Sequence, residues 1–325
     1  MKAVVCRSLE GPSALAVEEV PSPETQAGQV KVSVRASAVN YPDILMTQGK
    51  YQFKPPMPFT PGFESAGIVI ETAPDVKGWS AGDRVLTHQR VGGYAEELVV
   101  PAQEVTGLPD GMSFDEGAGF YVGALTAHVA LHWRGQLQAG EVLLVYGAAG
   151  GMGLAAVEVG KLMGAMVIGV ARGEDRQAVV AAKGANHVID PAAGIRDQVL
   201  EITGGAGADV VYDPVGGDAF DQSVRCIAWE GRIVIVGFAG GRIARLPTNL
   251  PLIKGFSVLG VRASEFGRRN PEKGERARET VLRWAAEGKL RPHISHRFPL
   301  DRAVDALKVL IERRAAGKVL LTMRG

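Results

Sequence analysis

A glycine-rich junction that follows an apolar run is the feature of the sequence that points most directly to chemistry. The run Val142–Tyr146 passes through the letters GAAGGMG, which end at Gly153, into a helix-forming stretch from Leu154. The order strand, loop and helix brings backbone amides and the positive end of a helix dipole to a diphosphate. Ala148 replaces the first glycine of the GxGxxG pattern, so a purely structural turn is the alternative. The residues predicted to bind a dinucleotide here are Ala149, Gly150, Gly151, Met152 and Gly153.

The residues after the second predicted strand of this region bear on the choice of nicotinamide cofactor. A carboxylate at this place would bind the ribose of NAD, but Ala171 stands there. Arg172 and Arg176 follow, and a guanidinium suits the 2′-phosphate of NADP by charge and by paired hydrogen bonds. The sequence therefore favours NADPH. The alternative is that both arginines are solvated at a helix start and that Glu174 or Asp175 binds the ribose of NAD.

The histidines and cysteines give little support to a metal or thiol site. His128 and His132 are four residues apart on a predicted helix, a spacing at which two imidazoles can share a metal ion. No acidic or thiol residue stands beside them, so helix packing or solvation is the favoured interpretation. Cys6 and Cys226 are too few for a disulfide framework or a four-thiolate zinc site, and they fit a reducing cytoplasm.

Two kinds of predicted element must position these residues. Short strands separated by turn formers fill the first third of the chain and predict a β-rich, barrel-like domain: Lys2–Arg7, Ala16–Val20, Gln29–Ala38, Ser65–Thr72, Arg84–Leu86 and Gly93–Val100. From about Phe114, helical segments alternate with buried apolar strands: Val142–Tyr146, Met166–Val170, His187–Ile189, Val210–Tyr212, Arg232–Val236 and Ser257–Val261. Six such strands predict a doubly wound parallel sheet.

The predicted fold is therefore α/β with two domains. A β-rich domain spans residues 1–121, a Rossmann domain spans 122–261, and residues 262–325 return to complete the first domain. In that last segment, Glu275–Glu287 and Leu300–Ala315 are predicted to be amphipathic helices and Lys318–Met323 a strand. We expect the active site between the two domains.

Composition and charge favour a small-molecule partner. The chain has 325 residues, of which 46% are hydrophobic and 22% charged, and its formal net charge is +1. A balanced charge offers no general attraction to nucleic acid or to an anionic membrane. The longest uncharged apolar stretch, Val142–Val157, is rich in glycine and too short to cross a membrane. We expect no membrane or nucleic-acid partner.

Several motifs in order resemble the zinc-independent quinone oxidoreductases, the zeta-crystallin-like family of the medium-chain dehydrogenase/reductase superfamily. The segment Ala148–Gly153, preceded by Gly123–Ala127, resembles that family's cofactor loop. The segments Asn40–Asp43, Gln48–Tyr51, Pro61–Gly67 and Gly82–Val85 are similar to its GroES-like catalytic domain, and Gly317–Leu320 is similar to its closing strand. The resemblance covers nearly the whole chain.

The resemblance implies further site residues. Asn40 and Thr126 are expected near the nicotinamide, Tyr51 at the substrate pocket, and Lys318 of the closing strand among the cofactor-binding residues. The residues expected to cover the cofactor include Val236, Gly237 and Phe238. Family members commonly form homodimers through the edge strand of the Rossmann sheet, here Ser257–Val261, so a homodimer is expected.

The resemblance also implies hydride transfer without zinc. Alcohol dehydrogenases of this superfamily bind zinc with a cysteine and with the histidine of a Gly-His-Glu motif, and here Phe63 replaces that histidine and Asn40 lies where the cysteine is expected. NADPH would then reduce an electrophilic small molecule such as a quinone or an α,β-unsaturated carbonyl. Tyr51 as a hydrogen-bond donor and Arg262 as a charge are the catalytic candidates. Alternatively, Tyr51 is a core aromatic and Arg262 forms an interdomain ion pair.

Two other functions fit parts of the sequence. Reduction of an enoyl thioester, such as an acryloyl-CoA, is suggested by the basic residues Arg262, Arg268, Arg269 and Lys273. A dinucleotide-binding protein without turnover, acting as a sensor or a single-strand RNA binder, is the alternative of another class. The neutral charge and the 6% aromatic content give no stacking platform for RNA.

Overall fold

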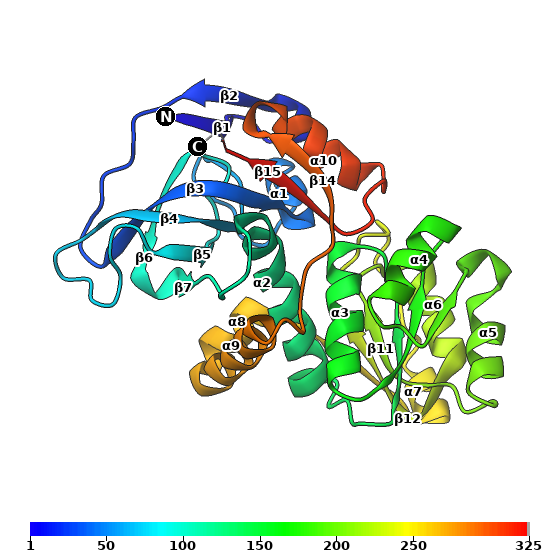
Figure 1. Cartoon of the computed structure of the whole chain (residues 1–325). Helices are drawn as coiled ribbons and strands as arrows, with labels where there is room; N and C mark the ends of the chain where they lie inside the picture. The colour runs from blue at the N-terminus through cyan, green and yellow to red at the C-terminus, as the bar shows by residue number, and fades with distance from the viewer. Residues whose placement is uncertain (324–325) are drawn as a thin grey trace. The chain divides into compact units, whose positions relative to one another are not determined.

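The structure, a computed structural model, describes residues 1–323 and divides the chain into two units (Figure 1). Unit 1 holds Met1–Val122 and the described residues from Arg291 onward, and unit 2 holds Gly123–Leu290. The sequence predicted that the returning segment begins at residue 262. The chain instead returns to unit 1 at Arg291. The reason is that α8 (Ala263–Arg269) packs on α9 (Pro271–Ala286), whose apolar face is buried in unit 2.

Unit 1 is built on a seven-stranded mixed sheet with the order β14-β15-β3-β4-β5-β7, in which β6 pairs with β3. Its strands are β3 (Gln29–Val39), β4 (Glu64–Thr72), β5 (Arg84–His88), β6 (Glu97–Pro101), β7 (Val105–Gly107), β14 (Ile294–Pro299) and β15 (Lys318–Thr322). A separate hairpin joins β1 (Lys2–Cys6) to β2 (Leu15–Glu19). Its helices are α1 (Tyr41–Thr47), α10 (Ala303–Ile311) and the start of α2 (Phe114–His128).

The long strand β3 shows why this unit folds. Along β3 every second side chain from Val30 to Val34 is buried, the alternation that places one face of a strand on a core. The opposite end, from Ser37 to Val39, is buried on both faces. It pairs with β15 on one side, with Val39 opposite Val319, and with β4 on the other, with Ser37 opposite Ser65. The C-terminal strand is thus built into the N-terminal sheet.

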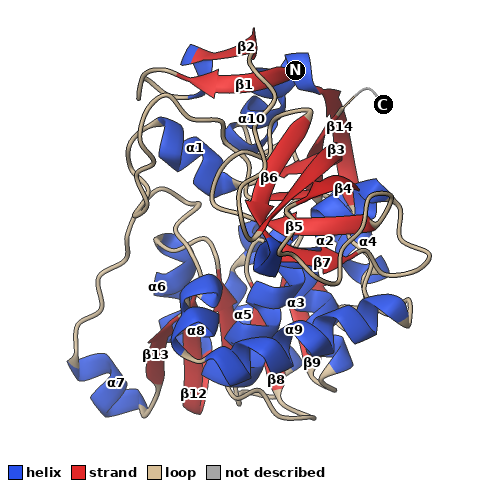
Figure 2. Cartoon of the chain, turned by 90° about the vertical axis from the view of Figure 1, so that its left-hand side faces the viewer, coloured by secondary structure: helices blue, strands red, loops and turns tan. Residues whose placement is uncertain are grey.

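Unit 2 is a parallel sheet of six strands in the order β10-β9-β8-β11-β12-β13, with helices on both sides (Figure 2). The strands are β8 (Val142–Val145), β9 (Met166–Val170), β10 (His187–Ile189), β11 (Ala208–Asp213), β12 (Ile227–Ile235) and β13 (Ser257–Gly260). The helices between them are α3 (Gly151–Leu162), α4 (Glu174–Ala182), α5 (Ile195–Ile202), α6 (Asp218–Cys226) and α7 (Asn249–Lys254). This strand order confirms the predicted doubly wound Rossmann sheet.

The core of unit 2 comes from strands that are apolar on both faces. Leu144, Ile168, Val211 and Ile233 have no exposed surface, as expected for strands covered by helices on each side. No helix within residues 1–323 is long and apolar enough to cross a lipid bilayer.

Candidate functional site

The glycine junction folds as a tight turn between β8 and α3. Gly147 has a positive φ of 56°, and the amide of Gly150 donates to the carbonyl of Gly147 at 2.9 Å. A Cβ atom on Gly153 would lie 2.1 Å from the oxygen of Gly147, so no side chain fits there. The helix α3 begins at Gly151, and its first amides have no acceptor within the helix. The turn therefore presents amides at the carboxyl edge of the sheet, where an anion can bind.

The alanine that departs from the glycine pattern has a packing reason. Ala148 is buried, and its amide donates to the carbonyl of Val170 in β9 at 3.1 Å. Its methyl group faces Gly169, where an added Cβ would lie 3.2 Å from that methyl and 2.5 Å from Val180. The glycine on β9 thus provides the room that the side chain of Ala148 occupies.

The residues that should discriminate between cofactors lie just after β9. Arg172 is exposed and makes no ion pair within residues 1–323, whereas Arg176 is half-buried in the first turn of α4. Glu174 and Asp175 are exposed in the same turn. The structure thus places basic and acidic groups together at this edge of the sheet.

A second loop lies at the carboxyl edge of the sheet, after β12. The amides of Val236 and Gly237 donate to the backbone oxygen of Asp213 at 2.8 and 3.3 Å, and Phe238 stays 40% exposed. The Asp213 carboxylate accepts from the amides of Val215 and Gly216, both at 2.8 Å. Its other oxygen has no partner among the described residues, and burial raises the pKa of this group. Asp213 was not predicted from the sequence, although a lone acid at the end of a buried strand is a usable signal.

The predicted residues Thr126 and Arg262 also belong to unit 2. Thr126 is half-buried on α2. Arg262 lies at the N-cap of α8, is exposed, and makes no ion pair in the described part of the chain.

A buried polar network gathers three residues of unit 1. The ammonium of Lys318 donates to Asn40 Oδ1 at 2.9 Å and to Glu64 Oε1 at 2.5 Å, and Asn40 Nδ2 donates to the same Glu64 oxygen at 3.1 Å. All three are buried, with exposures of 5%, 7% and 1% for Lys318, Asn40 and Glu64. The other Glu64 oxygen accepts from the amide of Val122 at 3.0 Å. The structure thus unites Asn40 with Lys318 and adds Glu64, which sequence analysis quoted only as part of a motif.

The backbone of Asn40 is fixed by a second buried acid. Asp43 accepts from the amide of Asn40 at 2.8 Å, from the amide of Gly62 at 3.0 Å and from the hydroxyl of Tyr94 at 2.8 Å. Burial raises the pKa of Asp43 to about 7, and the three hydrogen bonds oppose this shift. Asn40 is therefore held on both its backbone and its side chain, as a preorganised binding group requires.

The aromatic candidate Tyr51 packs beside the residue that replaces the zinc-binding histidine. Its ring lies edge-on to Phe63, with centroids 5.7 Å apart and an interplanar angle of 86°. Both rings pack against the core of unit 1 while staying partly exposed. Within residues 1–323, no three His, Cys, Asp or Glu side chains come together as a metal-binding group.

A chain with a GroES-like sheet domain and a six-stranded Rossmann domain is of the medium-chain dehydrogenase/reductase class. Two family models agree with this: an alcohol dehydrogenase GroES-like domain matches residues 26–110, and a zinc-binding dehydrogenase model matches residues 151–283. The quinone oxidoreductase-like protein 2 homolog of Nematostella vectensis is 38% identical over 99% of this chain and 89% of its own length.

Solved structures give the same result. The Escherichia coli quinone oxidoreductase complexed with NADPH has a TM-score of 0.91 and 28% identity, covering 99% of this chain and 100% of that one. The quinone oxidoreductase from Thermus thermophilus, also solved with NADPH, has a TM-score of 0.87 and 32% identity, covering 99% and 100%. The chain belongs to the quinone oxidoreductase family of the medium-chain dehydrogenase/reductase superfamily. This confirms the predicted family and fold.

Proposed function

We propose that this protein is an NADPH-dependent reductase that transfers a hydride to a quinone or to the β-carbon of an α,β-unsaturated carbonyl, without zinc. The observation that carries the proposal is the turn at Gly153, which has no room for a side chain and presents the first amides of α3. Structural neighbours crystallised with NADPH support the choice of cofactor. NADPH would supply the hydride, and the protein supplies binding, orientation and charge stabilisation.

Each part of the site has a task in this proposal. The amides of Gly151, Met152 and Gly153 bind the diphosphate, and Arg172 binds the 2′-phosphate. Thr126 and Asn40 hold the nicotinamide, and Val236–Phe238 cover it. Lys318 acts here by fixing Asn40, since its ammonium is already bonded to Asn40 and Glu64.

The substrate oxygen gains negative charge when the hydride is transferred. Tyr51 would donate a hydrogen bond to it, and Arg262 would stabilise its charge. Phe63 and Asn40 are not zinc ligands, so we infer that these two polar groups replace a metal ion in this role.

The enoyl thioester alternative is weakened by the pairing of the basic residues on which it depends. Arg268 and Arg269 each bind the carboxylate of Glu265 at 2.5 Å, and hydrogen bonds from Arg269 and Arg268 lower the pKa of Glu265 to about 2. Two of the four cations therefore already share a carboxylate within α8.

The decisive experiment is a substrate panel with the purified protein. Initial rates of NADPH oxidation are measured with 1,4-benzoquinone, a simple enone and an acryloyl thioester, and bound zinc is determined by elemental analysis. We expect turnover with a quinone or enone and substoichiometric zinc. A preference for the thioester would support the alternative, while tight NADPH binding without turnover on any of them would support a binding protein.

The choice of NADPH is tested by Arg172→Ala. Loss of a charged hydrogen bond to the 2′-phosphate should raise the Kd for NADPH by roughly ten- to a hundredfold and leave the Kd for NADH unchanged. Isothermal titration calorimetry measures both constants. Arg196→Ala is the matched control, since Arg196 is an exposed arginine paired with Asp197 on α5. Equal effects of Arg172→Ala on both cofactors would refute the phosphate assignment.

We further infer a homodimer in the cytoplasm. β13 is the edge strand of the parallel sheet, and Figure 2 shows it beside α7, where Leu252 and Ile253 are 82% and 67% exposed. An open edge flanked by exposed apolar side chains is a typical self-association surface. Cys6 and Cys226 are both free thiols, which fits a reducing compartment.

A further inference from the structure

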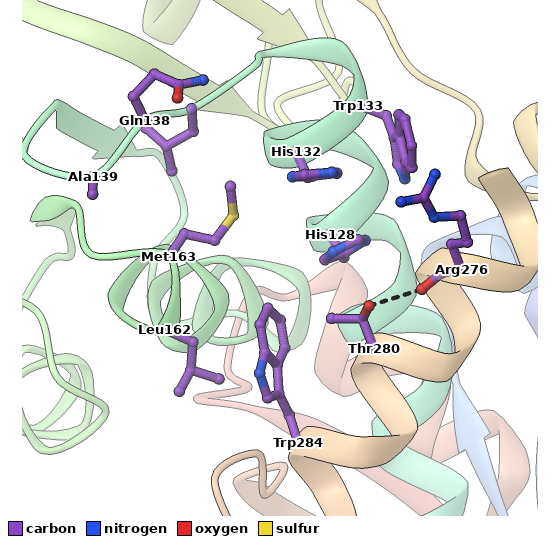
Figure 3. Close-up of a pocket in the computed structure, with 11 residues that line it drawn as sticks. His128, His132, Trp133, Gln138, Ala139, Leu162, Met163, Arg276, Thr280 and Trp284 are labelled. Carbon is purple, nitrogen blue, oxygen red and sulfur yellow. Dashed lines mark hydrogen bonds between the residues drawn. The ribbon is translucent and has the colours of Figure 1, made fainter.

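A hollow in unit 2 is separate from the diphosphate loop. It has a volume of about 400 Å³ and is bordered by the end of α2, by the following turn and by α9 (Figure 3). Leu162 and Met163 close it from the C-terminal end of α3, whereas the diphosphate loop lies at the N-terminal end. A helix of 12 residues is roughly 18 Å long, so the two places are well apart. The volume is typical of small-molecule pockets.

A π-helical turn shapes one wall of this hollow. α2 continues after His128 into a π-helix over Val129–Arg134, a rare conformation that often marks functional sites. The rings of His128 and His132 stack with centroids 5.0 Å apart and an angle of 22°, and Trp133 lies edge-on to His132 at 4.8 Å. Trp284 of α9 faces His128 at 5.7 Å (Figure 3). Four flat rings in contact with one another thus line the hollow, and such a wall suits a planar ligand.

Two polar groups in this wall lack partners. His128 is only 5% exposed, and its Nδ1 has no hydrogen-bond partner among residues 1–323; the same is true of the buried Nε1 of Trp133. A buried polar atom without a partner costs about 1–3 kcal/mol, so its presence calls for an explanation. Burial, with a smaller effect of His132, lowers the pKa of His128 to about 4. The ring is therefore neutral at pH 7 and adds no positive charge to the wall.

The charge beside the rings favours an anion over a metal ion. Arg276 of α9 lines the hollow, with its guanidinium carbon 5.9 Å from the centre of the Trp133 ring, and Lys273 lies 5.2 Å from the same centre. Neither cation forms an ion pair in the described part of the chain. Burial and then the charge of Arg276 lower the pKa of His132, so a divalent cation at the two histidines would meet the same repulsion. No third His, Cys, Asp or Glu joins them within residues 1–323.

We propose that the stacked His128–His132 pair, with Trp133, Trp284 and Arg276, forms a binding site for a planar aromatic carboxylate of one or two rings. The aromatic body stacks among the histidine and tryptophan rings, and Arg276 binds the carboxylate. The site does not depend on the proposed reductase function, and its ligand differs from the nucleotide. It shares α2 with Thr126, two residues before His128.

Binding is tested with the full-length protein in the absence of NADPH. The probes are benzoate, 2-naphthoate and the neutral 2-naphthamide, and their Kd values are measured by isothermal titration calorimetry. We expect 2-naphthoate to bind at least about tenfold more tightly than 2-naphthamide, since a charged hydrogen bond is lost in the amide. Equal affinity of acid and amide, or no binding of either acid at millimolar concentration, would overturn the proposal.

Four variants locate the site. Arg276→Gln should weaken the binding of 2-naphthoate roughly ten- to a hundredfold. Arg278 lies two residues further along α9 and is paired with Glu275. Arg278→Gln removes the same charge, but it should change the Kd for 2-naphthoate less than about twofold. His128→Phe keeps a flat ring but removes both ring nitrogens, and it should weaken binding while the protein stays folded. If Arg276→Gln and Arg278→Gln have equal effects, the acid binds elsewhere. Tight binding of Zn²⁺ or Cu²⁺ that His132→Ala abolishes, without binding of the acids, would assign the site to a metal instead.

Discussion

At the scale of single residues, the ammonium of Lys318 shows how a buried charge can serve a binding group. It is almost fully enclosed and donates to Asn40 and Glu64. Desolvating two charges costs several kcal/mol, so such a pair contributes little net stability, although removing one member is costly. The arrangement instead fixes the direction of the Asn40 amide, which the family resemblance places at the nicotinamide.

Substitution of Lys318 by Met should therefore destabilise the protein strongly. Glu64 would be left buried without its cationic partner, and the free energy of unfolding should fall by about 3–5 kcal/mol. Urea unfolding followed by circular dichroism measures this change. Lys308→Met, at an exposed lysine 3.9 Å from Asp305, is the control and should cost under about 1 kcal/mol. The double variant Glu64→Gln with Lys318→Met should recover part of the lost unfolding free energy. If the double variant loses as much unfolding free energy as the two single variants added together, the two residues are not coupled.

His128 predicts a pH dependence of stability. Its pKa in the folded protein is about 4, below the ordinary 6.5, so between these values the unfolded chain binds more protons than the folded one. The contribution of this residue to stability is then fully present above pH 6.5 and is lost as the pH falls toward 4, by up to about 3 kcal/mol.

The comparison with His128→Phe isolates this effect from that of the carboxylates, which titrate in the same range. The unfolding free energies of both proteins are measured by urea unfolding from about pH 7 down to about pH 4. As the pH falls, the wild-type protein should lose more unfolding free energy than the phenylalanine variant. A difference that is constant with pH would show that His128 titrates normally.

Much of the site at this scale could be predicted because motif residues follow strands in a fixed order. The glycines of the turn and Arg172 were predicted as site residues in that way. Glu64 and Asp213 were missed, since each gains its importance from partners that are distant in sequence or are backbone amides, such as Lys318 for Glu64. Only the folded chain brings Glu64 and Lys318 together.

At the scale of elements, continuous apolar runs were easier to recognise than short or polar strands. The bounds predicted for β9 and β10 are those of the structure; β9 is an apolar run, and β10 is a short strand that pairs in parallel with β9. β14 was missed because its letters ISHRFP show no apolar alternation, and it is held by parallel pairing with β15. The strand β7 was not predicted from the sequence, and its three residues are held by antiparallel pairing with β5. Tertiary pairing, rather than local propensity, creates both strands.

The turn between β8 and α3 makes a sharp prediction about an element. Gly153→Ala would place a Cβ atom 2.1 Å from the oxygen of Gly147, so the turn must open and its amides must move. We expect a loss of about 1–3 kcal/mol in unfolding free energy and a large rise in the Kd for NADPH. Gly107→Ala in β7 is the control, because nothing lies within 4 Å of its added Cβ. Chemical denaturation and calorimetry measure the two quantities; unchanged NADPH binding in Gly153→Ala would show that the diphosphate binds elsewhere.

At the scale of the whole molecule, the returning segment is what the sequence described least well. Amphipathic periodicity identified the helix near Glu275–Glu287, but periodicity does not reveal which unit a helix packs against. Ala277, Val281 and Ala285 form the buried face of α9. That face lies in unit 2, and only the residues from Arg291 onward complete the sheet of unit 1.

The proposed homodimer is also a property of the whole molecule. β13 pairs with a neighbouring strand on one side only, and α7 beside it exposes Leu252 and Ile253. Joining two such edges would extend the sheet and bury the apolar side chains in a symmetric contact. The wild-type protein should therefore have twice the mass of one chain in size-exclusion chromatography with light scattering.

The variant Leu252→Asp with Ile253→Asp should elute as a monomer, because the new carboxylates of both subunits would face one another across the contact. Ile311→Asp on α10, at an apolar residue that is 45% exposed in unit 1, should stay dimeric. A monomeric wild type, or a dimer that Ile311→Asp breaks and the α7 variant does not, would move the contact away from β13.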